Sequence, residues 1–264
     1  MEKKTETLQV DGLKIAMQAY LPSGFGIFPT LVLCHGLPSG APPEPGDGGY
    51  PALAKTFCHV GFATMIFNFR GAGESEGNLD MAGWTRDLSA VLDRVCYFPQ
   101  ADTNRINVMG FSAGAVVSIF VAANDSRVTA VASCACPSEF RFLPDAGAAQ
   151  KFVSHLRNIR LFRDPGFPPS LEEWLEGFRA VAAAKWVSRV SPRPLLLIHG
   201  DQDDVVPVKQ ARTLHDRAKE PKELLIIPGA GHRLRHEPRA MDAAMAWLKE
   251  VNGLNSSPAE MLSE

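Results

Sequence analysis

Apolar residues recur along the chain as short continuous runs separated by longer amphipathic stretches. Short apolar runs are typical of strands covered on both faces of a parallel sheet, and apolar residues at helical spacing are typical of helices packed on that sheet. The chain is therefore expected to alternate between strand and helix. The predicted strands are 28–34, 63–69, 106–109, 128–132, 194–198 and 223–227, and the predicted helices are 50–60, 84–98, 116–121, 208–219 and 238–251.

The chain begins with a different pattern. Residues 7–10 and 13–21 read as two strands, and Asp11-Gly12 stands between them. An Asp-Gly pair between two strand-like runs is a strong local signal for a hairpin turn. We therefore expect the sheet to start with an antiparallel hairpin.

The stretch with the strongest chemical signal runs from Arg105 to Ala122 and contains Gly110-Phe111-Ser112-Ala113-Gly114. A G-x-S-x-G pattern between a buried strand and a helix predicts a sharp, strained turn that exposes the serine hydroxyl at the carboxyl end of the sheet. The free N–H groups at the start of the following helix favour negative charge. Ala113 N–H is therefore a candidate oxyanion donor beside Ser112.

A second candidate donor follows the predicted strand 28–34, which ends in His35-Gly36-Leu37-Pro38. A glycine just past a strand end suits a backbone N–H turned toward a ligand, and proline has no N–H to offer. Leu37 N–H is therefore the candidate, although a simple strand-ending turn remains an alternative. The Gly-x-Gly at 71–73 lacks the residues of a phosphate loop, so we interpret it as a structural turn.

Strand and helix stop alternating between residues 137 and 191. A capping-box pattern at Ser170-Leu-Glu-Glu173 predicts a helix that ends at about Ala184. Another packing layer would suit this composition, but the insert directly follows the strand beyond Ser112, so we interpret it as a small helical lid. It carries eight of the chain's 22 Phe, Trp and Tyr residues, namely Phe140, Phe142, Phe152, Phe162, Phe167, Trp174, Phe178 and Trp186.

Composition narrows the functional classes. The 264 residues suit one domain with the insert at 137–191 and a polar tail at 255–264 that we expect to fray. A balance of 27 basic and 29 acidic residues, for a net charge of −2, gives no electrostatic case for nucleic acid or an anionic membrane. Five cysteines without a C-x-x-C pair favour free thiols. With no apolar signal core and no run long enough to cross a membrane, we expect a cytoplasmic protein.

Candidate acids and bases follow the later strands. An aspartate cluster, Asp201, Asp203 and Asp204, comes just after the strand at 194–198, and His232 comes just after the last predicted strand. His236 competes with His232 but lies at the entrance to the last helix. The order serine, acid, histidine, each at the carboxyl end of a predicted strand, points to nucleophilic catalysis.

From about residue 7 to residue 251 the chain resembles a small serine hydrolase of the α/β-hydrolase superfamily. The matching motifs are HG at 35–36, FRGAGESEG at 69–77, GFSAG at 110–114, HGDQDDVVP at 199–207 and GAGH at 229–232. The turn at 69–77 is similar to one in the esterase, thioesterase and serine-aminopeptidase-like branches. A serine at the elbow disfavours the dienelactone-hydrolase branch, which uses cysteine there, and the dehalogenase branch, which uses aspartate.

The resemblance implies an α/β-hydrolase fold: a mostly parallel central sheet with the antiparallel hairpin at its start, helices on both faces and a small helical lid. It also implies Ser112 as nucleophile, His232 as general base and Asp203 as the acid, through the pattern G-x-x-D-x-x-V-P. Leu37 and Ala113 would supply the oxyanion donors. This chemistry needs no metal and no cofactor.

Our functional prediction is a hydrolase that cleaves small or medium apolar carboxylic esters through an acyl-serine intermediate, with a small-molecule ester as its only expected partner. His35, His199 and His232 lack metal-ligand spacing, and we interpret His35 and His199 as strand-end hydrogen-bonding residues. An aminopeptidase or short-peptide hydrolase, a lyase or perhydrolase with the same triad, and a non-catalytic binding protein remain alternatives. The acyl group, the leaving group, the pathway and the oligomeric state stay open.

Overall fold

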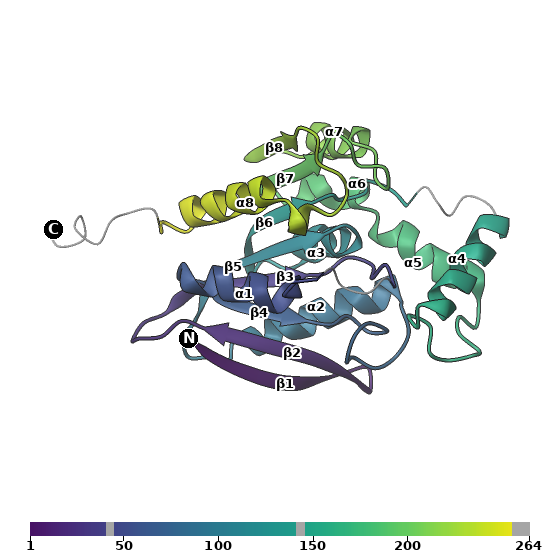
Figure 1. Ribbon diagram of the computed structural model, residues 1–264, viewed down its shortest axis with the longest axis horizontal. Coiled ribbons are helices and arrows are strands. Elements are labelled where there is room, and N and C mark those ends of the chain that lie inside the picture. Colours follow the sequence, from purple (N-terminus) through teal and green to yellow (C-terminus); the bar gives the residue numbers. More distant parts are fainter. Residues whose placement is uncertain (41–44, 141–145, 255–264) are drawn as a thin grey trace, which may run out of the picture.

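A twisted sheet of eight strands runs through the computed structural model, which describes residues 1–40, 45–140 and 146–254 (Figure 1). The strand order across the described sheet is β1-β2-β4-β3-β5-β6-β7-β8. The strands are β1 (Glu2–Val10), β2 (Leu13–Leu21), β3 (Phe28–Cys34), β4 (Ala63–Phe67), β5 (Ala101–Phe111), β6 (Val128–Cys134), β7 (Leu195–Gly200) and β8 (Lys222–Ile227).

The predicted N-terminal hairpin is present, but it is longer than the sequence indicated. β1 and β2 pair antiparallel along their whole lengths, and Asp11 (φ 51°) and Gly12 (φ 79°) form the turn between them. β1 begins at Glu2, whereas the apolar pattern placed its start at Thr7. Residues 2–6 are charged and polar, so their place in the strand comes from main-chain pairing with β2 and not from side-chain burial.

The strands that follow form the predicted parallel sheet. β2 pairs antiparallel with β4, and every neighbouring pair from β4 through β3 to β8 is parallel. The carboxyl ends of these six strands therefore lie along one edge of the sheet, where α/β proteins bind ligands. Each predicted run corresponds to one strand, but several bounds differ: β4 ends at Phe67 and not at Phe69, and β6 and β7 each extend two residues further. β5 differs most, since it begins at Ala101 and not at Ile106 and continues to Phe111.

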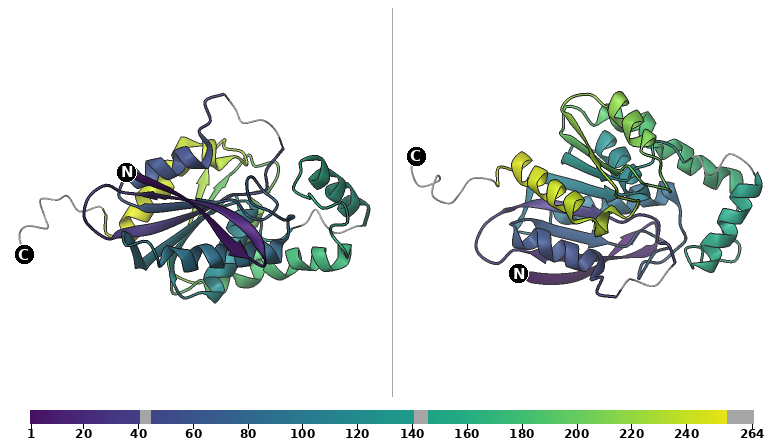
Figure 2. Two further views of the ribbon diagram at one scale, coloured as in Figure 1. Left: turned by 90° about the horizontal axis from the view of Figure 1, so that it is seen from below. Right: turned by 45° about the horizontal axis from the view of Figure 1, so that its top comes forward.

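Helices cover both faces of the sheet. Figure 2 shows α1 and α8 on one face and α2 and α3 on the other. The face under α1 and α8 buries Phe57 and Leu248, and the opposite face buries Trp84 and Ile119, all at 0% exposure. The helices are α1 (Gly49–His59), α2 (Met81–Val95), α3 (Ala113–Asn124), α4 (Ala146–Asn158), α5 (Leu171–Val181), α6 (Ala183–Trp186), α7 (Lys209–Arg217) and α8 (Pro238–Val251), with short 3₁₀ turns η1 (Val187–Arg189) and η2 (Leu234–His236).

The insert forms α4, α5, α6 and η1, and α4 stands out beyond one end of the sheet (Figures 1 and 2). The predicted cap is present, since Ser170 Oγ accepts a hydrogen bond from Glu173 N–H at 3.2 Å. The capped helix ends at Val181, earlier than the predicted Ala184, and α6 follows after one residue. Phe142 of the predicted aromatic set and the tail at 255–264 lie outside the described residues.

The turn at residues 69–77 anchors the insert to the sheet. Arg163 of the insert donates hydrogen bonds to the carbonyls of this turn, including Gly73 O at 2.9 Å. Trp174 of α5 donates through Nε1 to Leu79 O at 2.8 Å, just after the turn. The turn is thus structural, as predicted, and it fixes the base of α5 against the body of the molecule.

The five cysteines are free thiols, and Cys96 is the exposed one among them. Burial raises the pKa of Cys136 to about 12, so this thiol stays protonated at neutral pH. None of the helices in the described part of the chain has both the length and the apolar composition that crossing a bilayer requires.

Candidate active site

Ser112 occupies a strained turn between β5 and α3. Its backbone lies at φ 51° and ψ −122°, a region that residues with a side chain rarely adopt. Ser112 N–H donates to Cys134 O on the neighbouring β6 at 2.8 Å, which holds the turn in place. The serine predicted at the elbow therefore lies at the carboxyl edge of the sheet, as the G-x-S-x-G motif indicates.

The two glycines of the motif are required because other backbone lies against them. A Cβ on Gly110 would come 2.5 Å from Ala115 Cα, in the first turn of α3. A Cβ on Gly114 would come 2.3 Å from His35 O, at the end of β3. Their missing side chains let α3 start close to both β5 and β3.

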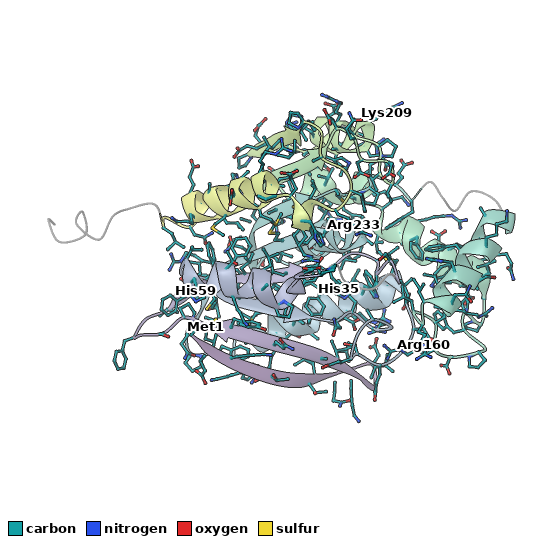
Figure 3. All side chains as sticks on the ribbon, viewed as in Figure 1. Met1, His35, His59, Arg160, Lys209 and Arg233 are labelled. Atoms are coloured by element: carbon teal, nitrogen blue, oxygen red, sulfur yellow. The ribbon has the colours of Figure 1, made fainter. Side chains whose placement is uncertain are left out.

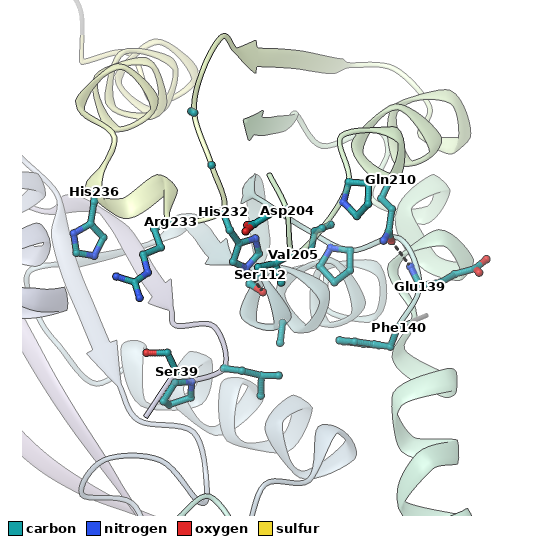
Figure 4. A pocket seen from close by; sticks show the side chains of 18 of the residues that line it. Ser39, Ser112, Glu139, Phe140, Asp204, Val205, Gln210, His232, Arg233 and His236 are labelled. Carbon is teal, nitrogen blue, oxygen red and sulfur yellow. Dashed lines mark hydrogen bonds between the residues drawn. The ribbon is translucent and has the colours of Figure 1, made fainter. Parts of the chain in front are cut away.

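A chain of hydrogen bonds joins the three predicted catalytic side chains. His232 Nε2 lies 3.1 Å from Ser112 Oγ, the pair labelled in Figure 4. On the other side of the ring, His232 Nδ1 lies 2.8 Å from Asp203 Oδ2. An ionised carboxylate only accepts, so Nδ1 carries the proton of the neutral ring. Nε2 is then free to accept the proton of the serine hydroxyl.

Asp203 is buried and has four hydrogen-bonding partners. Its Oδ1 accepts from Val205 N–H at 3.0 Å and Val206 N–H at 2.7 Å, and its Oδ2 lies 3.2 Å from His199 Nε2 as well as near His232. Burial acts to raise the pKa of Asp203, but the hydrogen bonds from His199, His232 and Val206 outweigh it and hold the pKa well below its ordinary value. The carboxylate is therefore charged at neutral pH.

His199 is a residue of this site for which the sequence predicted only hydrogen bonding at a strand end. Its Nε2 lies 2.7 Å from Val206 O, and a carbonyl can only accept, so Nε2 carries a proton. That proton also faces Asp203 Oδ2. The HGDQD spacing, which places His199 four residues before Asp203, is the sequence signal that could have indicated this contact.

The competing candidates lie elsewhere. Asp201 accepts a hydrogen bond from Gly229 N–H at 2.7 Å, and Asp204 is exposed. His236 Nε2 lies 2.8 Å from Arg235 Nη2 and 3.7 Å from Asp47 Oδ2. The structure thus joins Asp203 and His232, and not Asp201, Asp204 or His236, to the serine.

The two predicted oxyanion donors flank Ser112. Ala113 N–H is the first of α3, and the loop carrying Leu37 packs on the elbow, since a Cβ on Gly36 would lie 3.0 Å from Ser112 Cβ. Within the described ranges, neither Leu37 N–H nor Ala113 N–H donates a hydrogen bond to another residue. Both groups are therefore available for a ligand.

Two cavities meet at Ser112 and His232. The larger has a volume of about 1160 Å³ and lies between the strand ends and α4. The smaller, of about 690 Å³, extends past Tyr50 and Asn68 toward the start of the chain. In Figure 4, Phe140 and His236, which both line the larger cavity, lie on opposite sides of Ser112. Residues of the insert that line the larger cavity include Phe140, Phe152, His155, Leu156 and Ile159.

Only part of the insert's aromatic set lines the larger cavity. Of the aromatic residues that the structure describes there, Phe140 and Phe152 line the larger cavity. Trp174 and Phe178 are buried and pack against each other with ring centroids 4.8 Å apart. Large aromatic rings bury much apolar surface when they pack against one another, and this packing holds α5 on the body of the protein.

No group of three or more His, Cys, Asp or Glu side chains in the described ranges is arranged to hold a metal ion. The histidines of the site instead contact backbone groups and a carboxylate, as described above. His232 has both ring nitrogens engaged by Ser112 and Asp203. The arrangement therefore suits proton transfer between a hydroxyl and an imidazole.

The chain is similar in sequence to a known family and to known proteins. The model of the prolyl oligopeptidase family matches residues 50–255. Uncharacterized protein PA2218 of Pseudomonas aeruginosa is 26% identical over 274 residues, which covers 84% of this chain and 72% of that protein.

Solved structures show the same fold. The α/β hydrolase GrgF from Penicillium sp. sh18 superposes with a TM-score of 0.76 at 20% identity, over 95% of this chain and 99% of that one. An α/β serine hydrolase homologue from Coxiella burnetii superposes with a TM-score of 0.62 at 25% identity, over 94% of this chain and 96% of that one.

Proposed function

The chain belongs to the prolyl oligopeptidase family and is an α/β-hydrolase of the serine hydrolase type, and from this premise we propose that it cleaves small or medium apolar carboxylic esters through an acyl intermediate on Ser112. The observation that carries the proposal is the unbroken hydrogen-bond chain from Ser112 Oγ through His232 to Asp203. A serine hydroxyl is a weak nucleophile until a base removes its proton.

In the first half of the proposed reaction, Ser112 Oγ attacks the ester carbonyl while its proton passes to His232 Nε2. Asp203 holds the imidazole through Nδ1–H and stabilises the imidazolium that forms. The N–H groups of Leu37 and Ala113 hold the negative oxygen of the tetrahedral intermediate, each contributing about 3 kcal/mol. His232 then returns the proton to the departing alkoxide, and the alcohol leaves.

The second half repeats the sequence with water. His232 Nε2 takes a proton from a water molecule, whose oxygen attacks the acyl carbon of the Ser112 ester. Collapse of the second tetrahedral intermediate releases the carboxylic acid, and the proton on His232 returns to Ser112 Oγ. The net reaction converts an ester and water into a carboxylic acid and an alcohol.

The preference for apolar esters is supported by the walls of the larger cavity. Phe140, Phe152, Leu156 and Ile159 line it beside the serine. Each methylene group buried against such a wall contributes about 0.8 kcal/mol to binding. Turnover is therefore expected to rise with acyl length until the cavity is full.

The test combines active-site labelling with a substrate panel. A fluorophosphonate probe should label the wild-type chain at Ser112. The panel is p-nitrophenyl acetate, butyrate and octanoate beside leucine and alanine p-nitroanilides, each compared by kcat/KM. Turnover of any ester faster than both anilides supports the esterase proposal, and faster turnover of an anilide overturns it.

A second candidate, an aminopeptidase or short-peptide hydrolase, is favoured by the acidic residues at the larger cavity. A bound peptide amine needs a carboxylate partner, and Glu139, Asp204 and Glu237 line this cavity. Glu172 and Glu176, acidic residues of the insert, are instead exposed on α5 and paired with Arg179, as expected for a solvated helix face. The anilides of the panel distinguish the two functions.

A further inference from the structure

His35 directly follows β3 and precedes the two residues that carry the candidate oxyanion peptide, and it has little freedom to move. Its side chain lies near the centre of the molecule, below Arg233 in the view of Figure 3, and only 7% of the residue is exposed. The ring makes edge contacts with Phe69 and Trp84, at centroid distances of 5.1 and 5.5 Å. The imidazole is thus held by packing on its faces and edges.

Two backbone contacts define which nitrogen of His35 carries the proton. Phe69 N–H donates to Nε2 at 3.0 Å, so Nε2 has no hydrogen. The neutral ring therefore carries its proton on Nδ1, which donates to Gly36 O at 2.7 Å. Burial lowers the pKa of His35 to about 4, so the ring stays neutral at pH 7 and above.

The bond to Gly36 O restrains a group on the other side of the same peptide. The Gly36 carbonyl and the Leu37 N–H belong to one planar trans unit and point in opposite directions. Gly36 has no side chain, and rotation of this peptide is limited mainly by what the carbonyl contacts. A hydrogen bond that fixes the carbonyl therefore fixes the direction of the Leu37 N–H.

We propose that His35 is a positioning residue of the oxyanion site: its Nδ1–H holds the Gly36 carbonyl so that the Leu37 N–H faces the substrate oxygen. This inference rests on the proposed serine hydrolase reaction. The turn at 69–77 takes part as well, since Phe69 N–H selects the required tautomer. Without the bond, the peptide would be free to rotate and present its carbonyl oxygen to the oxyanion.

Two substitutions of His35 separate its two hydrogen bonds. In His35→Asn the side-chain amide nitrogen occupies the place of Nδ1 and keeps a donor for Gly36 O, but the acceptor for Phe69 N–H is lost. In His35→Gln the amide oxygen occupies the place of Nε2 and keeps that acceptor, but the donor is lost. Each variant removes one buried hydrogen bond, so each is the control of the other for stability.

We expect His35→Gln to lower kcat by about 10²-fold or more with little change in KM, because one oxyanion donor is misplaced. His35→Asn should retain kcat within about tenfold of wild type. Inhibition by butaneboronic acid, whose serine adduct is tetrahedral, should weaken in parallel with kcat/KM. Equal losses in the two variants, or a larger loss in His35→Asn, overturn the inference. A wild-type chain that neither takes the fluorophosphonate label nor hydrolyses the panel overturns the proposed function instead.

A measurement on the wild-type chain tests the tautomer even where a variant fails to fold. Nitrogen-15 NMR of the histidine rings at pH 7 should show His35 protonated on Nδ1 and bare on Nε2. A proton on Nε2 contradicts the bond to Gly36 O, and the inference with it.

Discussion

At the scale of single residues, the site depends on a backbone conformation that its own sequence disfavours. Ser112 is a non-glycine residue at positive φ, and such strain costs on the order of 1–3 kcal/mol unless the surroundings enforce it. The bond from Ser112 N–H to Cys134 O and the close approach of α3 to β3 enforce it here. The hydroxyl is therefore held in position before any substrate binds.

Replacing the hydroxyl alone should abolish the reaction and leave the fold intact. We expect Ser112→Ala to lower ester turnover by about 10⁴-fold or more, because in the described part of the chain Ser112 is the hydroxyl residue hydrogen-bonded to His232. The melting temperature should stay close to that of wild type, since alanine meets the same backbone strain. Fluorophosphonate labelling and thermal unfolding of both proteins check this, and equal labelling of the variant would place the nucleophile elsewhere.

The aspartate cluster offers a matched pair of substitutions. Asp203→Asn removes the carboxylate that holds His232 Nδ1–H, and we expect kcat to fall by about 10⁴-fold. Asp204→Asn changes the adjacent, exposed residue and should stay within about threefold of wild type. Steady-state kinetics on one p-nitrophenyl ester compare the two. A large loss of kcat in Asp204→Asn with a small loss in Asp203→Asn would contradict the assignment of Asp203 as the acid.

The sequence predicted which residues would meet because each of them follows a strand of a parallel sheet. The ends of β3, β5, β7 and β8 lie on one edge, so Leu37, Ser112, Asp203 and His232 gather there whatever the intervening lengths. The second bond of His35, to Phe69 N–H, was not predictable in this way. It depends on ring orientation inside the core, which spacing along the chain does not determine.

At the scale of elements, helices and strands were predicted well wherever one face is buried against the sheet. The insert was harder to predict because it lacks that repeating pattern. Its capping box predicted the start of α5. The direction that each side chain faces depends on how α4 and α5 pack, which the sequence does not show. Trp174 and Phe178 of α5 are buried, whereas Phe152 of α4 both contacts these two rings and lines the cavity. Aromatic content alone therefore does not define a substrate pocket.

Substituting one wall residue of α4 should change selectivity for acyl length. We expect Phe152→Ala to lower kcat/KM for p-nitrophenyl octanoate by roughly tenfold. The loss corresponds to about two methylene groups of the acyl chain that are no longer buried, at about 0.8 kcal/mol each. Turnover of the acetate should change by less than about twofold, since a two-carbon acyl group has little apolar surface to bury against Phe152.

Phe162→Ala is the matched control, because this ring packs in the same insert against Trp174 and does not line the larger cavity. It should lower the melting temperature and leave the octanoate-to-acetate ratio unchanged. A shift of that ratio in Phe162→Ala equal to the shift in Phe152→Ala would show that loosening of the insert, and not the cavity wall, sets the selectivity.

At the scale of the whole molecule, the fold holds ionisable groups in opposite charge states. His35 is kept neutral in the core, while Asp203 and Asp47 are kept charged, the latter by its bonds to Arg235. Each arrangement stabilises the folded chain only where pH permits that charge state. The free energy of unfolding should therefore fall on acidification in two separate pH ranges.

The first pH range follows from His35, whose pKa drops from its ordinary value of 6.5 to about 4 on folding. Between these values the unfolded chain binds a proton that the folded chain excludes, so the free energy of unfolding falls as pH drops from 6.5 to 4, by about 3 kcal/mol in all. Asp203 and Asp47 have lowered pKa values, so the stability they contribute is lost only below about pH 4.

Urea unfolding at pH 7, 5.5 and 4.5 measures the loss of stability in the first of these pH ranges, in wild type and in His35→Asn. The variant should lose less stability across it, and a wild-type profile that is flat from pH 6.5 to 4.5 would show that His35 takes up its proton in the folded state.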